Sequence, residues 1–234
     1  MTNSSNLGCL QSNTERARQN ARRWYSDPAL VPTARKHDAE VEPRYSKFIA
    51  SEISGFGTRA PTIIDIGCGE GLLAKTFTSF RKYIGVDPDC AELHTEATPS
   101  SDSVEFVRAG IENLPSTVPS ADIVVSSLNI ALWDDPSERC AQLRRLLNPE
   151  GHILIVDLLR TGPCIQHTAA DELNQFLIDQ YNASFTDEEV ASLCQSSLPG
   201  AEVTTYTDER DGIVPFASDS SNFGKLFLIH FQEA

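Results

Sequence analysis

Residues 63–73 read IIDIGCGEGLL, an apolar run that leads into three closely spaced glycines. The run is too continuously apolar for a half-exposed strand, so it predicts a strand buried on both faces, followed by a tight turn and a helix. Glycines at the end of such a strand let the backbone pass within contact distance of a ligand, at the edge where open α/β sheets bind ligands. The segment therefore predicts a ligand-binding turn.

The spacing of the glycines narrows the class of ligand. Gly67, Gly69 and Gly71 follow the pattern GxGxG, and the position that would complete the dinucleotide fingerprint GxGxxG is Leu72. No Lys-Ser/Thr pair follows that would make a phosphate-binding P-loop. A purely structural turn is the alternative interpretation.

A carboxylate after the next apolar run supports a nucleoside-containing ligand. Residues 83–86 end at Asp87, twenty residues after Gly67. An acid at this place can accept hydrogen bonds from both hydroxyls of a ribose. We therefore expect a cofactor that contains a nucleoside.

The alternation of apolar runs and helical segments continues along the chain. From Pro61 onward it is typical of repeated βα units, so we expect a doubly wound α/β fold with a mainly parallel, seven-stranded sheet and about six helices. The capping box that begins at Thr186 indicates a helix start. The expected strands are residues 62–66, 83–86, 104–107, 123–126, 153–158, 202–206 and 225–231, and the expected helices of the last third are 169–181 and 186–195.

The residues before the sheet are expected to form a cap. Residues 1–12 are polar, with too few apolar side chains to offset the entropy of ordering, so they predict a disordered tail. A helix opening near Thr14 should stop at Asp27-Pro28, and a second should cover about 39–54. We therefore expect a tail 1–12, an N-terminal helical cap 13–57 and a core 58–234.

The charge of the chain bears on its partners. The net charge of −14 repels phosphate backbones and anionic membranes, which argues against nucleic acid and membrane partners. The charge is uneven, +2 over residues 1–57 and −16 over the remainder. Either the first segment is a solvated helix on an acidic body, or one of its cations faces an anionic group of a ligand; the candidates are Arg22, Arg23, Arg35 and Lys36.

The six cysteines show no CxxC pair and no histidine at ligand spacing, so we expect no metal site. No run approaches the roughly eighteen apolar residues of a membrane helix. We therefore expect a cytoplasmic protein with free thiols. The sequence does not indicate an oligomeric state.

The motifs together resemble those of a known family. Residues 65–71, DIGCGEG, look like motif I of the class I S-adenosylmethionine-dependent methyltransferases, and 85–87, GVD, resembles the ribose-binding acid that follows it. Residues 112–115, ENLP, are similar to the loop beside the adenine, and 146–155 are similar to the helix end, Pro-Gly turn and fifth strand of that family. The resemblance runs in order over about residues 58–160. It implies S-adenosylmethionine as cofactor, S-adenosylhomocysteine as product, and cofactor contacts from Asp65, Gly67, Cys68, Gly69, Asp87, Ile111, Glu112 and Ser127.

The chain departs from the family pattern at one position. Many members carry an Asp two residues before the Glu of the adenine loop, and this chain has Gly110 there. The resemblance then leaves the adenine to the backbone and side chain of Ile111 and to Glu112.

By the same resemblance, the methyl acceptor is expected between the cap, the end of the fourth strand and an insert at about 159–200. The fourth strand ends in SSLN, residues 126–129, which differs from the Asn/Asp-Pro-Pro-Tyr/Phe pattern of enzymes that methylate amino groups of bases. The candidate acceptor-binding residues are Tyr25, Trp133 and Arg160. Tyr25 and Trp133 could instead dock their segments on the core, and Arg160 could pair with Asp157.

A general base is expected only if the acceptor atom is a hydroxyl or an acidic carbon. His167, past the fifth strand, is the first candidate and His37 in the cap the second, although either could be a surface histidine. The leading hypothesis is methyl transfer to O, N or C of a small molecule. The alternatives are a catalytically silent binding or scaffold protein, a non-methylating enzyme on the same fold, and a protein methyltransferase.

Overall fold

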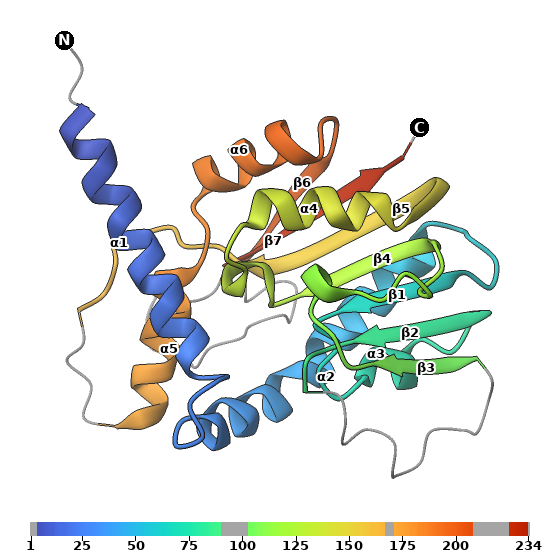
Figure 1. Cartoon of the computed structure of the whole chain (residues 1–234), viewed down its shortest axis with the longest axis horizontal. Coiled ribbons are helices and arrows are strands. Elements are labelled where there is room, and N and C mark those ends of the chain that lie inside the picture. Colours follow the sequence, from blue (N-terminus) through green and yellow to red (C-terminus); the bar gives the residue numbers. More distant parts are fainter. Residues whose placement is uncertain (1–3, 90–102, 167–170, 208–224, 234) are drawn as a thin grey trace.

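The computed structural model describes residues 4–89, 103–166, 171–207 and 225–233 (Figure 1). Its helices are α1 (Ser4–Arg23), α2 (Val31–Gly55), α3 (Leu72–Thr76), α4 (Pro136–Arg145), α5 (Glu172–Ala183) and α6 (Asp187–Ser197), with 3-10 turns η2 (Ile111–Asn113) and η3 (Ile130–Leu132). Its strands are β1 (Thr62–Ile66), β2 (Lys82–Val86), β3 (Val104–Val107), β4 (Ala121–Ser127), β5 (Leu147–Leu158), β6 (Glu202–Thr207) and β7 (Lys225–Gln232).

The strands form one sheet in the order β3-β2-β1-β4-β5-β7-β6, which confirms the predicted doubly wound, mainly parallel sheet of seven strands. Strands β1 to β5 are parallel, and β7 runs antiparallel to both of its neighbours. The chain steps outward from β1 to β3 and then returns to place β4 on the other side of β1. The carboxyl ends of β1 and β4 therefore flank the switch point at which such sheets bind ligands.

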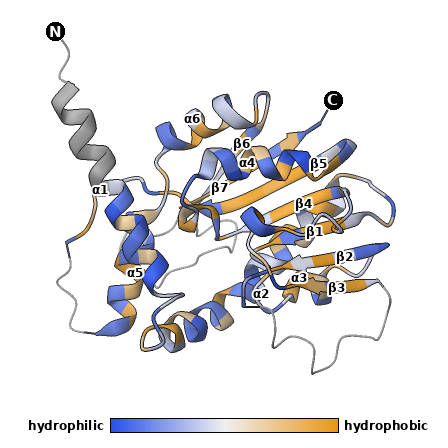
Figure 2. Cartoon of the chain, viewed as in Figure 1, coloured by the Kyte–Doolittle hydropathy of each residue, from blue (hydrophilic) through white to orange (hydrophobic). Residues whose placement is uncertain are grey.

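Helices cover both faces of the sheet, and Figure 2 shows the apolar character of the strands between them. One face packs against α4 and α6 through side chains such as Leu143 and Leu193. The other face packs against α3 and the second half of α2, where Tyr45, Ile49 and Ile53 are buried. The second half of α2 is thus a layer of the core, although the expected boundary at 57/58 assigned it to the cap.

The N-terminal helices are longer than expected. Helix α1 begins at Ser4, so the backbone of residues 4–12 is helical and the expected disordered tail is wrong there. Ala17 and Ala21 are buried, and a helix anchored at one end extends at little cost because each added residue adds a hydrogen bond. Helix α2 begins at Val31, with Pro32 in its first turn where no partner for its nitrogen is needed.

The end of α1 is fixed on α5, which follows β5 in the chain. The indole nitrogen of Trp24 donates a hydrogen bond to Asp179 Oδ2 at 2.9 Å, and the Trp24 ring meets the edge of Phe176 with centroids 5.4 Å apart. Both aromatic side chains are buried. This contact brings the N-terminal helices over the carboxyl edge of the sheet (Figure 1).

Within the described residues, no helix has the length and apolarity that a membrane crossing requires. A search of the same residues finds no group of three or more His, Cys, Asp or Glu side chains placed to hold a metal ion.

Candidate functional site

The turn after β1 exposes bare backbone at the switch point. Gly67, Gly69 and Gly71 all have positive φ angles, of 74°, 48° and 66°. The N–H groups of Gly67 and Cys68 donate to the Val86 carbonyl at 2.8 and 3.2 Å, which fixes the turn against the end of β2. A side chain at Gly67 would overlap the amide of Asn129. The turn is therefore a backbone cradle that only glycine can form.

Asp87 lies where the sequence predicts, directly after β2. Its Oδ2 accepts a hydrogen bond from the Gly69 N–H at 3.2 Å, and its Oδ1 accepts one from the Asp89 N–H at 2.8 Å. Partial burial raises the pKa of the carboxyl group, and these two hydrogen bonds oppose the rise. A carboxylate beside the cradle can accept hydrogen bonds from ligand hydroxyls.

Asp65 lies beneath the cradle and is not exposed to solvent there. Its carboxyl group is buried and accepts a hydrogen bond from the Tyr83 hydroxyl at 2.6 Å. Burial raises the pKa of Asp65 to about 6. The neighbouring Cys68 is also buried, and its thiol donates to the Gly69 carbonyl at 3.7 Å. Both residues support the turn from below.

Glu42 is a residue of this site that the sequence does not single out. It reaches the cradle from α2, so that a Cβ on Gly69 would lie 3.2 Å from Glu42 Oε1. Burial raises the pKa of Glu42 to about 7, helped by the charges of Glu70, Asp65 and Asp38. The one sequence signal is its place next to Val41 on the core-facing side of α2.

The adenine-loop residues form the turn η2. Ile111 is buried in the core, and Glu112 is exposed with its Oε1 accepting from the Asn113 side chain at 3.3 Å. A side chain at Gly110 would overlap the Glu112 carboxylate. Glu112 thus occupies the space that an Asp at position 110 would use. Ser127, half-buried at the end of β4, lies beside Val156 in the sheet register.

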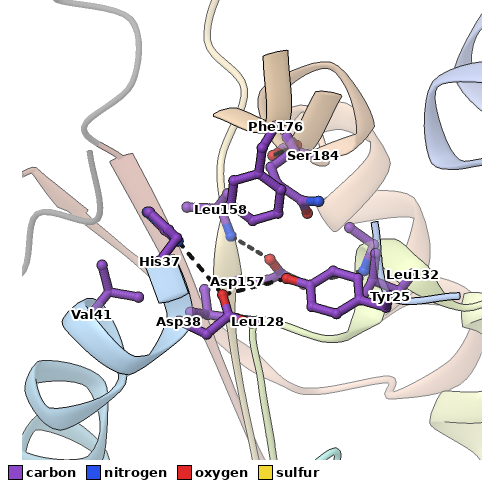
Figure 3. Close-up of a pocket in the computed structure, with 12 residues that line it drawn as sticks. Tyr25, His37, Asp38, Val41, Leu128, Leu132, Asp157, Leu158, Phe176 and Ser184 are labelled. Atoms are coloured by element: carbon purple, nitrogen blue, oxygen red, sulfur yellow. Dashed lines mark hydrogen bonds and ion pairs between the residues drawn. The ribbon is translucent and has the colours of Figure 1, made fainter. Parts of the chain in front are cut away.

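A small cavity, the acceptor pocket, lies beside the cradle (Figure 3). Its volume is about 30 Å³. Tyr25 Oη donates to Asp38 Oδ1 at 3.5 Å, and His37 Nδ1 lies 3.5 Å from the same oxygen. Two expected residues, Tyr25 and His37, therefore meet here. The lining residues are Tyr25, His37, Asp38, Val41, Leu128, Ala131, Leu132, Asp157, Leu158, Phe176, Gln180 and Ser184.

The acidic floor of the acceptor pocket is Asp157, at the end of β5. It is buried, and its oxygens accept hydrogen bonds from the backbone N–H groups of Leu158 at 2.7 Å and Ala131 at 3.1 Å. Burial raises the pKa of Asp157 to about 6. These bonds tie β5 to η3, so Asp157 shapes the pocket.

Two expected acceptor-site residues, Trp133 and Arg160, are not among the described residues that line the pocket. Trp133 is buried in the core and anchors its loop. Arg160 donates to the carbonyls of Ser184 and Gly162, both at 3.4 Å, and lies 3.9 Å from Glu189 rather than pairing with Asp157. His167 lies outside the described residues.

Two pairs of consecutive residues connect the cradle with the acceptor pocket. On α2, Val41 lines the pocket and Glu42 reaches the cradle. After β4, Leu128 lines the pocket, and the Asn129 amide packs on Gly67 and donates to the Ile66 carbonyl at 3.3 Å. The pocket therefore lies close to the cradle at the switch point, and transfer between two bound molecules needs such closeness.

A doubly wound sheet with a glycine cradle after β1 and an acid after β2 defines a protein that binds a nucleoside-containing ligand. Residues 64–155 match the family described as a methyltransferase domain. An uncharacterised chloroplastic methyltransferase of Arabidopsis thaliana is 28% identical over 164 residues, which cover 64% of this chain and 45% of that protein. A malonyl-[acyl-carrier protein] O-methyltransferase of Halalkalibacterium halodurans is 29% identical over 128 residues, covering 51% of this chain and 41% of that protein. The chain spans less than half the length of these relatives.

A solved structure shows the same fold over nearly the whole chain. The plantazolicin methyltransferase BpumL, in complex with a monoazolic desmethylPZN analog and SAH, is 22% identical with a TM-score of 0.72, covering 95% of this chain and 97% of that one. The match of residues 64–155 to a methyltransferase domain and the shared fold therefore agree with the resemblance to class I S-adenosylmethionine-dependent methyltransferases that the motifs carry.

Proposed function

We propose that this protein transfers a methyl group from S-adenosylmethionine to a small molecule bound in the acceptor pocket. The observation that carries the proposal is the closeness of the pocket to the glycine cradle, since Leu128 lines the pocket and the next residue, Asn129, packs on Gly67. Methyl transfer from a sulfonium is an in-line displacement, so the protein mainly has to hold donor and acceptor in contact.

The residues around the cradle fit this cofactor. The Asp87 carboxylate would accept hydrogen bonds from the ribose hydroxyls, and the bare turn would carry the methionine tail. Glu42 would face the ammonium group of that tail. Ile111 and Glu112 would contact the adenine, since Glu112 places a carboxylate where Gly110 offers none. When bound, the cofactor supplies a methyl carbon activated by the neighbouring positive sulfur.

The chain's own groups would then position the acceptor and exclude water. Tyr25 and Phe176 wall the pocket from the turn after α1 and from α5. His37 and Asp38 present hydrogen-bonding groups from α2, and either could take the proton that the acceptor releases.

The proposal also covers the cellular compartment of the reaction and the class of acceptor. Cys68, Cys140, Cys164 and Cys194 are free thiols in the described structure, which supports a reducing compartment such as the cytoplasm. The acidic surface supports a small acceptor rather than a nucleic acid.

Calorimetry with S-adenosylmethionine and S-adenosylhomocysteine tests the cofactor site, and a screen of acceptors with a labelled methyl donor tests transfer. Binding of both compounds and labelled product would support the proposal. A folded protein that binds neither would refute it. Binding without transfer to any acceptor would favour a scaffold protein on the same fold.

A further inference from the structure

The described residues that line the acceptor pocket include two acids and neither Lys nor Arg, and this balance of charge bears on the chemistry of the acceptor. We propose that the acceptor is an amine, held by the carboxylate of Asp38. The proposal rests on the proposed function and narrows it, because the methyl group would go to nitrogen.

The charges around the acceptor pocket favour a cation or a neutral hydrogen-bond donor. Asp38 and Asp157 both line it, and none of its described lining residues is Lys or Arg. Arg18 acts on Asp157 through its charge, but Arg18 and Arg22 make their contacts outside the pocket lining. Arg18 lies over the Phe185 ring at 4.4 Å and contacts Glu189, and Arg22 donates to the Trp133 carbonyl at 3.1 Å.

The two carboxylates have different roles. Asp157 is buried and is held in place by the backbone N–H groups of Leu158 and Ala131, which donate hydrogen bonds to it. The contacts of Asp38 Oδ1 with Tyr25 and His37 are both 3.5 Å long, and 36% of its side chain is exposed. An ionised carboxylate has about four lone-pair sites and accepts only, so Asp38 has capacity left for N–H donors of a ligand.

The remaining walls also suit an amine. Tyr25 and Phe176 lie edge to face with centroids 6.3 Å apart, and aromatic faces attract cations. The side-chain nitrogen of Gln180 is buried in the pocket wall without a hydrogen-bond partner among the described residues, so it can donate to an oxygen atom of the acceptor outside the amino group. A carboxylate acceptor would meet two like charges in a low-dielectric site, which is unfavourable.

The size of the acceptor pocket agrees with a small reacting group. A volume of about 30 Å³ has room for about two water molecules. An amino head group therefore fits beneath Tyr25, with the rest of the acceptor extending past the aromatic ring.

The chemical step balances with the groups at hand. The bound ammonium would first give one proton to the Asp38 carboxylate, which would pass it to water. The free amine would then give its lone pair to the methyl carbon as the carbon–sulfur bond breaks, with the electron pair left on sulfur as a neutral thioether. The new N-methylammonium would again be paired with the Asp38 carboxylate.

The test measures binding of matched probes to the complex with S-adenosylhomocysteine. Benzylamine, benzyl alcohol and benzoate share one ring and differ in the head group. We expect benzylamine to bind and benzoate not to bind. We also expect the labelled methyl group to pass to amines in preference to carboxylic acids and alcohols.

Variants connect the effect to Asp38. Asp38→Asn should lower affinity for benzylamine at least tenfold, since a hydrogen bond to a charged group contributes about 1.5–3 kcal/mol, whereas Asp38→Glu should retain part of it. Glu40→Gln, which removes an exposed carboxylate on the same helix, should have no effect. Affinity for S-adenosylhomocysteine serves as the folding control for all three variants.

Equal or tighter binding of benzoate or benzyl alcohol, absence of benzylamine binding, or an unchanged Asp38→Asn variant would each overturn the amine proposal. If S-adenosylhomocysteine still binds in those cases, the proposed methyltransferase function stands. If neither cofactor form binds to the folded protein, the proposed function itself fails.

Discussion

The carboxylate of Asp87 accepts a hydrogen bond from the backbone N–H of Gly69 at 3.2 Å. This bond joins two motifs that lie eighteen residues apart in the chain and come together because β1 and β2 are parallel neighbours. It holds the acid and the glycine cradle in one fixed relation. A ligand that spans both therefore finds its partners already placed, which favours binding.

Replacing Asp87 with Ala should weaken binding of S-adenosylhomocysteine by about tenfold or more, because charge-assisted hydrogen bonds to the ribose are lost. Isothermal titration calorimetry measures the change. Asp89→Ala is the matched control, since Asp89 contacts Asp87 through its backbone and its side chain is exposed. Unchanged affinity in Asp87→Ala would mean that the ribose lies elsewhere.

Ala substitutions at two glycines with similar backbone angles distinguish the cost of backbone strain from the cost of steric overlap. Gly67 and Gly57 have φ angles of 74° and 69°, but a Cβ on Gly67 would overlap Asn129, whereas one on Gly57 would meet no atom within 4 Å. Gly57→Ala should cost about 1–2 kcal/mol of unfolding free energy from strain alone. Gly67→Ala should cost more and also abolish cofactor binding. Urea denaturation and calorimetry measure both effects, and equal losses of stability in the two variants would contradict the close packing of Asn129 on Gly67.

Glu42 should make cofactor binding depend on pH. Burial raises its pKa to about 7, and the acids near it, Glu70, Asp65 and Asp38, act in the same direction. An ammonium group binds the ionised carboxylate more tightly, so affinity for S-adenosylhomocysteine should rise by up to about eightfold from about pH 6 to 7.5. In Glu42→Gln this rise should disappear. Calorimetry across that range measures it.

Deprotonation of Glu42 should strengthen cofactor binding but lower the free energy of unfolding of the free protein. Because the folded pKa of Glu42 lies above its unfolded value, the free protein should lose stability as pH rises toward about 7. Glu42→Gln should flatten this part of the stability profile. Glu40→Gln is the control for both measurements, and a variant profile identical to the wild type would show that Glu42 does not titrate in this window.

The sequence predicts the sheet and the cradle well because both are local. The central strands contain short apolar runs, and the cradle needs glycines at three nearby positions with positive φ angles. Asp87 follows its strand directly. The capping box at Thr186 is confirmed by the reciprocal bonds with Glu189 at 2.8 and 3.3 Å, and the helix begins at the next residue.

The acceptor pocket could not be predicted in the same way because it depends on how α1, α2 and α5 pack together. Asp38 and Glu42 follow no motif, and their places are set when the second half of α2 packs on the sheet. Trp133 has the composition of a pocket wall, but the loop after η3 turns it into the core. Such orientations follow from tertiary contacts between segments far apart in sequence.

Two neighbouring histidines, His152 on β5 and His230 on β7, predict a second effect of pH on the free energy of unfolding. His152 Nδ1 lies 3.0 Å from His230 Nε2 on the antiparallel strands β5 and β7, and the Phe56 ring stacks on both imidazoles at 4.4 and 4.7 Å. Burial, and then the charge of His230, lower the pKa of His152. At His152 the unfolded chain therefore binds more protons than the folded protein near the ordinary histidine pKa. The free energy of unfolding should for this reason fall as the pH falls below about 6.5.

The variant His152→Gln should lose less of its free energy of unfolding than the wild type between about pH 7.5 and 5.5, as measured by urea denaturation. The buried acids Asp65 and Asp157, with raised pKa values, act in the opposite direction in both proteins, so the difference between the two profiles isolates the histidine pair. Parallel profiles would show that the pKa of His152 is not lowered in the folded protein.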